Sequence, residues 1–135
     1  MGGGGVEAPF GLGVNSTGEI FVGTMTTSAS VDLGAGPLSC AGSCIALAAI
    51  DRDGATVWSK LFASGAAASA AAMSVDVTSS IALGGSLFAT ADLGGPPLVA
   101  PACTSKAAPD AFVVRYDGDG FICGRAASAT ATTRR

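Results

Sequence analysis

The chain contains no histidine, and this absence removes the commonest general base, proton switch and metal ligand from its chemistry. A Ser-His-Asp triad, a Cys-His pair and a histidine-based zinc site are therefore excluded. The remaining acidic and hydroxyl side chains form no recognisable acid-base pair. We expect no catalytic residue and no enzymatic activity within these 135 residues.

Charged residues are also scarce, at 13% of the chain, and the net charge is −3. The lysines and arginines are scattered rather than gathered into a basic stripe, which argues against nucleic-acid binding. Long apolar runs are missing too. The region between Lys60 and Asp92 is interrupted by Asp76, glycines and serines, and does not approach the ~20 apolar residues of a membrane helix. We expect no membrane span.

The first ten residues lack both the basic segment and the apolar run of a secretory signal. Either the protein is not exported, or the sequence is an internal piece of a longer protein. The four glycines at 2–5 carry no side chain to bury and predict a flexible lead-in over residues 1–10.

Small and apolar residues dominate what is present: 49% of the chain is hydrophobic but only 6% is aromatic. This composition predicts an ordered protein with closely packed small side chains. Short runs rich in β-branched and aromatic residues, such as 19–24 and 56–62, alternate with turn signals such as 51–54, Asp-Arg-Asp-Gly. These patterns predict antiparallel strands joined by hairpin turns.

The sequence repeats itself after about sixty residues. Val-Asp-Leu-Gly-Ala-Gly-Pro-Leu at 31–38 returns as Ala-Asp-Leu-Gly-Gly-Pro-Pro-Leu at 91–98. Ile20 and Ile81 are 61 positions apart, Asp32 and Asp92 are 60 apart, and Asp51 and Asp117 are 66 apart. The larger last spacing predicts an inserted loop between Leu98 and Asp110. Repetition at this period is typical of architectures in which each unit buries a face against its neighbour.

The repeat divides the chain into two units of about four short strands each. We expect the first at 11–62 and the second at 74–125. Residues 63–73 are alanine-rich, but Gly65 and the interspersed serines favour a linker loop over a helix. Residues 126–135 are expected to form a frayed tail.

At these residues the chain resembles the bacterial SBBP-type, or seven-bladed, β-propeller repeat of predicted cell-surface and secreted proteins. Val75-Asp76, the segment 92–98, the segment 110–117 and Val-Trp-Ser-Lys at 57–60 stand where that repeat has its motifs. Departures occur: Cys44 and Ala46 replace Asp110 and Phe112 in the first unit, and Gly124 replaces Trp58 in the second.

The resemblance implies an all-β fold of about two antiparallel, four-stranded, propeller-type blades. It implies a non-catalytic structural or binding module at a bacterial cell surface or outside the cell, with a protein or glycan partner. Two blades do not close a propeller, which typically has four to eight, so further blades or self-association are expected. The alternatives are a lectin-like sugar-binding oligomer and a fragment of a propeller enzyme whose catalytic residues lie outside this chain.

Four cysteines permit two disulfides. Cys40 and Cys44 are the easiest pair because their short Ala-Gly-Ser loop can bring them together, which leaves Cys103 with Cys123. The competing interpretation is four free, buried thiols that pack as small hydrophobic groups. A zinc site of four cysteines is a further alternative, but the chain lacks paired C-x₂-C motifs.

Four aspartates are the nearest approach to a ligand set, namely Asp51, Asp53, Asp117 and Asp119 in the two Asp-x-Asp-Gly turns. They are candidates for binding calcium. Ordinary hairpin turns need the same residue types, and the full twelve-residue calcium loop is missing, so the turn interpretation is favoured. We also interpret the repeated Asp32, Asp76 and Asp92 as structural and Trp58 as a core residue rather than a sugar platform. The sequon at Asn15 is interpreted as a turn.

Overall fold

The computed structural model describes residues 2–62, 68–95, 97 and 110–128. Every regular element in these ranges is a β-strand, so the all-β expectation is confirmed. The strands are β1 (Gly2–Gly3), β2 (Glu7–Val14), β3 (Ile20–Thr26), β4 (Ser30–Asp32), β5 (Pro37–Ser39), β6 (Cys44–Ile50), β7 (Thr56–Phe62), β8 (Ala68–Val75), β9 (Ile81–Leu87), β10 (Asp110–Tyr116) and β11 (Ile122–Ser128).

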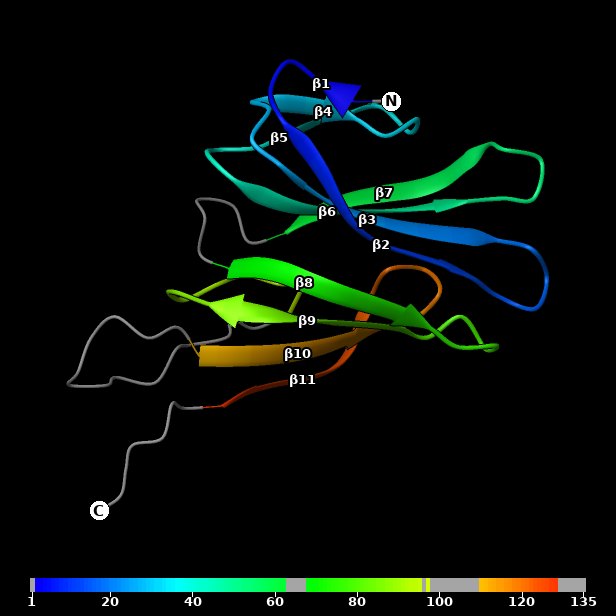
Figure 1. Ribbon diagram of the computed structural model, residues 1–135. Coiled ribbons are helices and arrows are strands. Elements are labelled where there is room, and N and C mark those ends of the chain that lie inside the picture. The colour runs from blue at the N-terminus through cyan, green and yellow to red at the C-terminus, as the bar shows by residue number, and fades with distance from the viewer. Residues whose placement is uncertain (1, 63–67, 96, 98–109, 129–135) are drawn as a thin grey trace.

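The strands form two four-stranded antiparallel sheets and one small three-stranded sheet (Figure 1). The first sheet has the order β2-β3-β6-β7 and the second has the order β8-β9-β10-β11. β4 and β5 lie between β3 and β6 in the chain and form the small sheet together with the N-terminal β1, and this sheet lies over the first sheet (Figure 1). Each four-stranded sheet is therefore built from two hairpins placed side by side.

The two sheets are copies of one unit. The first residues of β2 and β8, Glu7 and Ala68, are 61 positions apart, as are those of β3 and β9. The first residues of β6 and β10, Cys44 and Asp110, are 66 positions apart, as are those of β7 and β11. These are the spacings at which the sequence repeats. Residues related in this way are called equivalent below.

Three expected boundaries differ from the structure. β2 begins at Glu7, inside the expected lead-in, and Gly2–Gly3 of that segment pairs with β4. β8 begins at Ala68, so residues 68–73 of the expected linker are a strand. β11 continues to Ser128, three residues into the expected tail, whose remainder lies outside the described residues. Alanine has little strand propensity, so the contact of β8 with β2 and β9, rather than local sequence, determines this strand.

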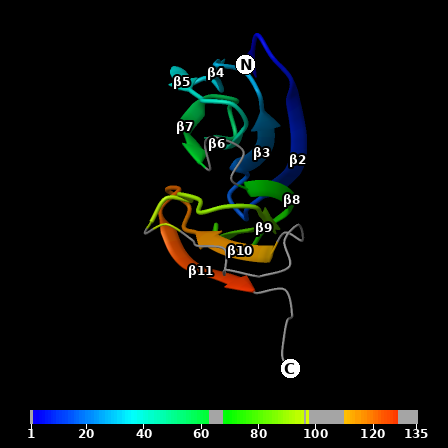
Figure 2. The same cartoon turned by 90° about the vertical axis from the view of Figure 1, so that its left-hand side faces the viewer.

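The main core lies between the two four-stranded sheets. The first sheet contributes Phe21, Ile45, Leu47 and Ala49, and the second contributes Ile81, Leu83, Phe112, Val114 and Tyr116. The sheets approach each other most closely where β2 faces β8 (Figures 1 and 2). At that point Gly11 and Gly13 leave room for Met73 and Val75, because a Cβ on either glycine would overlap the facing side chain.

A smaller core lies on the other side of the first sheet. Val31 and Leu33, at the start of the inserted segment, pack there on Ala46 and Ala48 of β6. The segment that contains Ala91 and Leu93 takes the same place in the second sheet, but there it is part of the main core. Each unit thus covers the same face of its sheet with the same Asp-Leu-Gly segment.

The two sheets pack through opposite faces. Phe112 and Val114, which face the first sheet, are equivalent to Ala46 and Ala48, which face away from the second sheet. The residues equivalent to the inward-facing Phe21, Ile45 and Leu47 are Ala82, Ala111 and Val113, and these are exposed. One unit therefore follows the other front to back, as consecutive units do in a repeat array.

Candidate functional site

Four tight turns of one type lie at one end of the two sheets, toward the right of Figure 1. They span residues 15–19, 51–55, 76–80 and 117–121. In each turn the first N–H donates to the fifth carbonyl, and the fourth N–H donates to the first carbonyl. Both turns of a sheet share an end because Ile20 pairs with Ile50 and Ile81 pairs with Tyr116. We call this surface the turn end.

The first side chain of each turn caps the turn's own backbone. Asp51 Oδ1 accepts hydrogen bonds from the N–H groups of Asp53 and Ala55, both at 2.9 Å. Asp117 Oδ1 accepts from Asp119 and Phe121 at 2.9 and 3.0 Å. Local side-chain to backbone bonds of this kind are the usual reason that Asp and Asn begin turns.

Asn15 and Asp76, at the equivalent first positions of the other two turns, make the same contacts. The Oδ1 atom of each accepts from the backbone N–H groups two and four residues later. Hydrogen bonds from the Thr78 hydroxyl and from the backbone of Ser80 hold the pKa of Asp76 below its ordinary 3.8. Asp76 is thus a turn residue, which agrees with its interpretation as structural.

The fourth turn position requires a positive φ angle. Gly54 and Gly120 occupy it with φ of 93° and 81°, and Gly18 does so in the first turn. Ser79 fills the same position with φ of 71° and is the only non-glycine residue with positive φ in the described part of the chain. A side chain is disfavoured there, and Ser79 has a compensating contact with Asn15.

The calcium candidates are therefore divided between two equivalent turns. Asp51 and Asp117 direct Oδ1 to their own backbones, while Asp53 and Asp119 are exposed. Within residues 2–62, 68–95, 97 and 110–128, no group of three His, Cys, Asp or Glu side chains could hold a metal ion together. The contacts give Asp51 and Asp117 the turn role favoured by the sequence, and calcium binding stays a prediction.

Two hydrogen bonds join the turns of the two sheets. Asn15 Nδ2 donates to Ser79 Oγ at 2.7 Å, and Ser16 Oγ donates to the carbonyl of Val77 at 3.1 Å. Both polar atoms of the Asn15 amide are thus engaged, Oδ1 within its own turn and Nδ2 across the sheets. This supports the structural interpretation of Asn15 over a glycan attachment site.

Trp58, on β7, joins the first sheet to the turn 117–121 of the second sheet. Its Nε1 donates to the carbonyl of Gly118 at 2.9 Å, and its ring packs against the main core beside Phe21, with ring centroids 6.4 Å apart. Lys60 Nζ donates to the carbonyl of Asp119 at 3.1 Å and lies 3.8 Å from the centroid of the Phe121 ring. Trp58 is thus a packing residue between sheets, as predicted.

The repeated aspartates Asp32 and Asp92 also organise turns. Asp32 Oδ1 accepts from the N–H of Gly34 at 2.7 Å, and Asp92 Oδ1 accepts from the N–H of Gly94 at 2.9 Å. Both glycines have positive φ, 103° and 107°. In each copy a leucine lies between the aspartate and the glycine, and a hydrogen bond holds its backbone carbonyl. The carbonyl of Leu33 accepts from the Thr56 hydroxyl, and that of Leu93 accepts from the Tyr116 hydroxyl.

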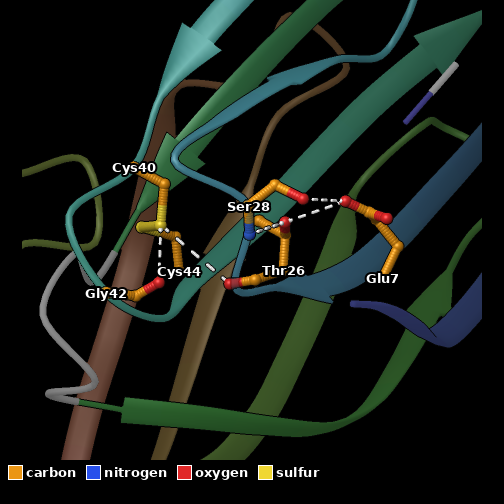
Figure 3. The surroundings of a disulfide bond; sticks show 6 residues. All are labelled: Glu7, Thr26, Ser28, Cys40, Gly42 and Cys44. Atoms are coloured by element: carbon orange, nitrogen blue, oxygen red, sulfur yellow. Dashed lines mark hydrogen bonds between the residues drawn. A yellow bond between two sulfur atoms is a disulfide. The ribbon is translucent and has the colours of Figure 1, made fainter. Parts of the chain in front are cut away.

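Cys40 and Cys44 form a disulfide, with their Cα atoms 6.1 Å apart, as the short loop between them predicts (Figure 3). The bond closes the connection from β5 to β6 at the end of the first sheet. Cys123, on β11, is exposed and forms no disulfide with another described residue. Its expected partner, Cys103, lies outside the described residues, so that pairing stays a prediction.

A buried polar cluster beside the disulfide has no clear signal in the sequence (Figure 3). The hydroxyls of Ser28 and Thr26 both donate to Glu7 Oε1, and Ser28 Oγ accepts from the N–H of Gly5 at 2.8 Å. Ser28 is only 2% exposed, so its hydroxyl is not presented to a substrate. The cluster fixes the start of β2 to the end of β3, and only the pairing of those strands brings its members together.

No protein-family model matches the sequence, and no curated protein is similar to it at a significant level. Among the residues that the structure describes, no helix has the length and apolar character needed to cross a membrane.

Proposed function

We propose that the chain is a non-catalytic structural or binding module, made of two propeller-type blades, of a bacterial cell-surface or secreted protein. The observation that carries this proposal is the packing of two equivalent four-stranded sheets through opposite faces. A pair packed in this way leaves the outward face of each sheet without a neighbouring four-stranded sheet. Consecutive blades of a propeller pack with the same front-to-back relation.

The described side chains support a structural role. The aspartates and the asparagine that begin the turns accept hydrogen bonds from the backbone of their own turn, and Trp58 donates a hydrogen bond to the carbonyl of Gly118. Ser28, which lies beside a carboxylate, is buried. The Cys40–Cys44 disulfide is compatible with an oxidising location such as the cell exterior.

Incubation of the disulfide-bonded protein with isolated bacterial envelopes and with a glycan array tests this proposal. We expect saturable retention on an envelope component whose mass is unchanged after elution, and no retention by the reduced and urea-unfolded protein. Saturable binding of the folded protein to one class of glycan would instead favour the lectin-like alternative. A change in the mass of the bound component, caused only by the folded protein, would contradict a non-catalytic module.

A further inference from the structure

An aliphatic stripe on the outward face of the first sheet is exposed along β2 and half-buried along β3. It consists of Leu12 and Val14 on β2 and their cross-strand partners Val22 and Ile20 on β3. Leu12 is 67% exposed and Val14 is 55% exposed. The segment that covers this face packs instead on β6, against Ala46 and Ala48. Val22 packs against this smaller core, whereas Leu12 and Val14 are left without a cover.

The equivalent stripe in the second sheet is covered. Its members are Met73, Val75, Ile81 and Leu83, and all four belong to the main core or pack against it. Ile81 and Leu83 are fully buried. The cover is the inward face of the first sheet, where glycines in β2 admit the side chains of β8. The molecule thus already contains one interface in which this stripe fits against small residues of a neighbouring unit.

The exposed face of the second sheet supplies the other half of such an interface. Ala72, Ser74 and Gly84 are equivalent to Gly11, Gly13 and Gly23 of the first sheet, so the positions that admit the stripe are again occupied by small residues. A shallow, mostly apolar hollow of about 270 Å³ lies on this surface, and its lining includes Ala82 and Val113. We call this surface the far face.

We propose that a second copy of this chain docks its aliphatic stripe into the far face, so that copies associate head to tail. The inference rests on the proposed repeat architecture, and it names the partner and the two surfaces that meet. The interface between the two sheets of one chain is the template for this contact. There the stripe of the second unit packs against the small residues on the inward face of the first unit. A head-to-tail contact with a closing rotation gives a ring, and rings of four to eight blades correspond to about two to four copies.

The far face favours a weak contact. Leu47 and Phe21 of the first sheet, which fill the internal interface, are replaced there by Val113 and Ala82, so less apolar surface is available for burial. Arg115 stands at the position of Ala49 and adds a charge near the contact. We therefore expect association that depends on protein concentration rather than a permanent oligomer.

Light scattering coupled to size-exclusion chromatography, over a range of protein concentrations, tests the proposal. The wild type is expected to reach at least twice the mass of one chain. Val14→Asp, in the stripe, and Ala82→Glu, on the far face, should each remain monomeric. The matched control is Val77→Asp, because Val77 is 72% exposed in a turn outside both surfaces, and it should associate as the wild type does.

Mixing the two monomeric variants gives the sharper result. The intact far face of Val14→Asp can accept the intact stripe of Ala82→Glu, so the mixture should form a one-to-one dimer that cannot grow. A folded wild type that stays monomeric at every concentration overturns the proposal, as does a mixture that remains monomeric. Association of either variant alone also overturns it. Cooperative urea unfolding of each variant shows that it is folded, and envelope binding by a monomer would leave the proposed function standing.

Discussion

Leu47 and Val113 occupy the same position in the two units and have different surroundings. Leu47 is 1% exposed between the sheets, whereas Val113 is 53% exposed on the far face. The same contrast holds for Phe21 and Ala82. The repeat thus preserves strand positions, turns and the Asp-Leu-Gly segment, while side-chain size follows which face has a neighbour.

This comparison explains how two units can form a stable pair. The large residues of each sheet are concentrated on the face that meets the other sheet, and small residues remain on the two outward faces. Terminal units of repeat proteins reduce their exposed apolar surface for the same reason. The aliphatic stripe departs from this rule, and it is the surface from which association is proposed.

Truncation at equivalent positions should have the largest effect. Leu47→Ala removes a buried side chain and leaves a cavity, so we expect a loss of about 2–5 kcal/mol in the free energy of unfolding. Val113→Ala should change it by less than about 0.5 kcal/mol. Urea unfolding of both variants at a concentration that favours the monomer measures the difference. Equal effects would mean that the two faces are not distinguished as described.

Enlarging a small residue between the sheets should have the second-largest effect on the free energy of unfolding. Gly13→Val would place side-chain atoms in the space occupied by Val75, and we expect a loss of up to about 3 kcal/mol from overpacking. The equivalent change Ser74→Val lies on the far face and should leave monomer stability nearly unchanged. Its predicted consequence is weaker association. Gly13→Val with wild-type stability would contradict the close contact of β2 and β8.

The disulfide distinguishes the units further, because Asp110 stands in the second unit where Cys44 stands in the first. Removing the cross-link in Cys40→Ala/Cys44→Ala should lower the free energy of unfolding by about 2 kcal/mol, as estimated from the closure of a short loop. A reducing agent should lower wild-type stability by a similar amount and leave the double variant unaffected. An equal response of both proteins to reduction would rule out this assignment.

Tyr116, equivalent to the half-buried Ile50, gives a smaller effect that depends on pH. Burial, and secondarily the charge of Asp92, raises the pKa of Tyr116 above its ordinary 10.0. Its hydroxyl donates to the buried carbonyl of Leu93 at 2.6 Å. The folded state therefore favours the neutral phenol, so this contribution is present below about pH 10 and declines as the pH rises above it.

Replacement of this residue by phenylalanine should lower stability by about 1 kcal/mol at neutral pH and reduce the additional loss above pH 10. The chain has a single tyrosine, so ultraviolet absorbance follows its ionisation directly. Ionisation of the folded protein at the ordinary pH of a free tyrosine would contradict the buried hydrogen bond.

The sequence predicts the turns and the repeat well because local chemistry determines them. Asp51 begins its turn with a side chain that bonds the next few backbone groups, and this pattern needs no distant partner. The Cys40–Cys44 pair is local in the same sense. Asn15 and Asp76 lack the Asp-x-Asp-Gly signature, yet form the same turn.

Features that depend on contacts between residues far apart in the sequence cannot be predicted from local sequence. β8 is rich in alanine, and its extended conformation follows from pairing with β9 and packing on the glycines of β2. The bond between Ser28 and Glu7 requires the register of β2 with β3. Which face of each sheet is buried also depends on the partner sheet, because the equivalent strands of the two sheets place opposite faces in the main core.

The central claim, that equivalent sheets pack through opposite faces, is tested most directly by nuclear Overhauser effects in a dilute, isotope-labelled sample. The account predicts cross-peaks from the Hα atoms of Gly11 and Gly13 to the side chains of Met73 and Val75, respectively. It predicts no cross-peak from the methyl groups of Leu12 to Met73. Strong Leu12–Met73 cross-peaks without the glycine cross-peaks would show that like faces meet, and would contradict it.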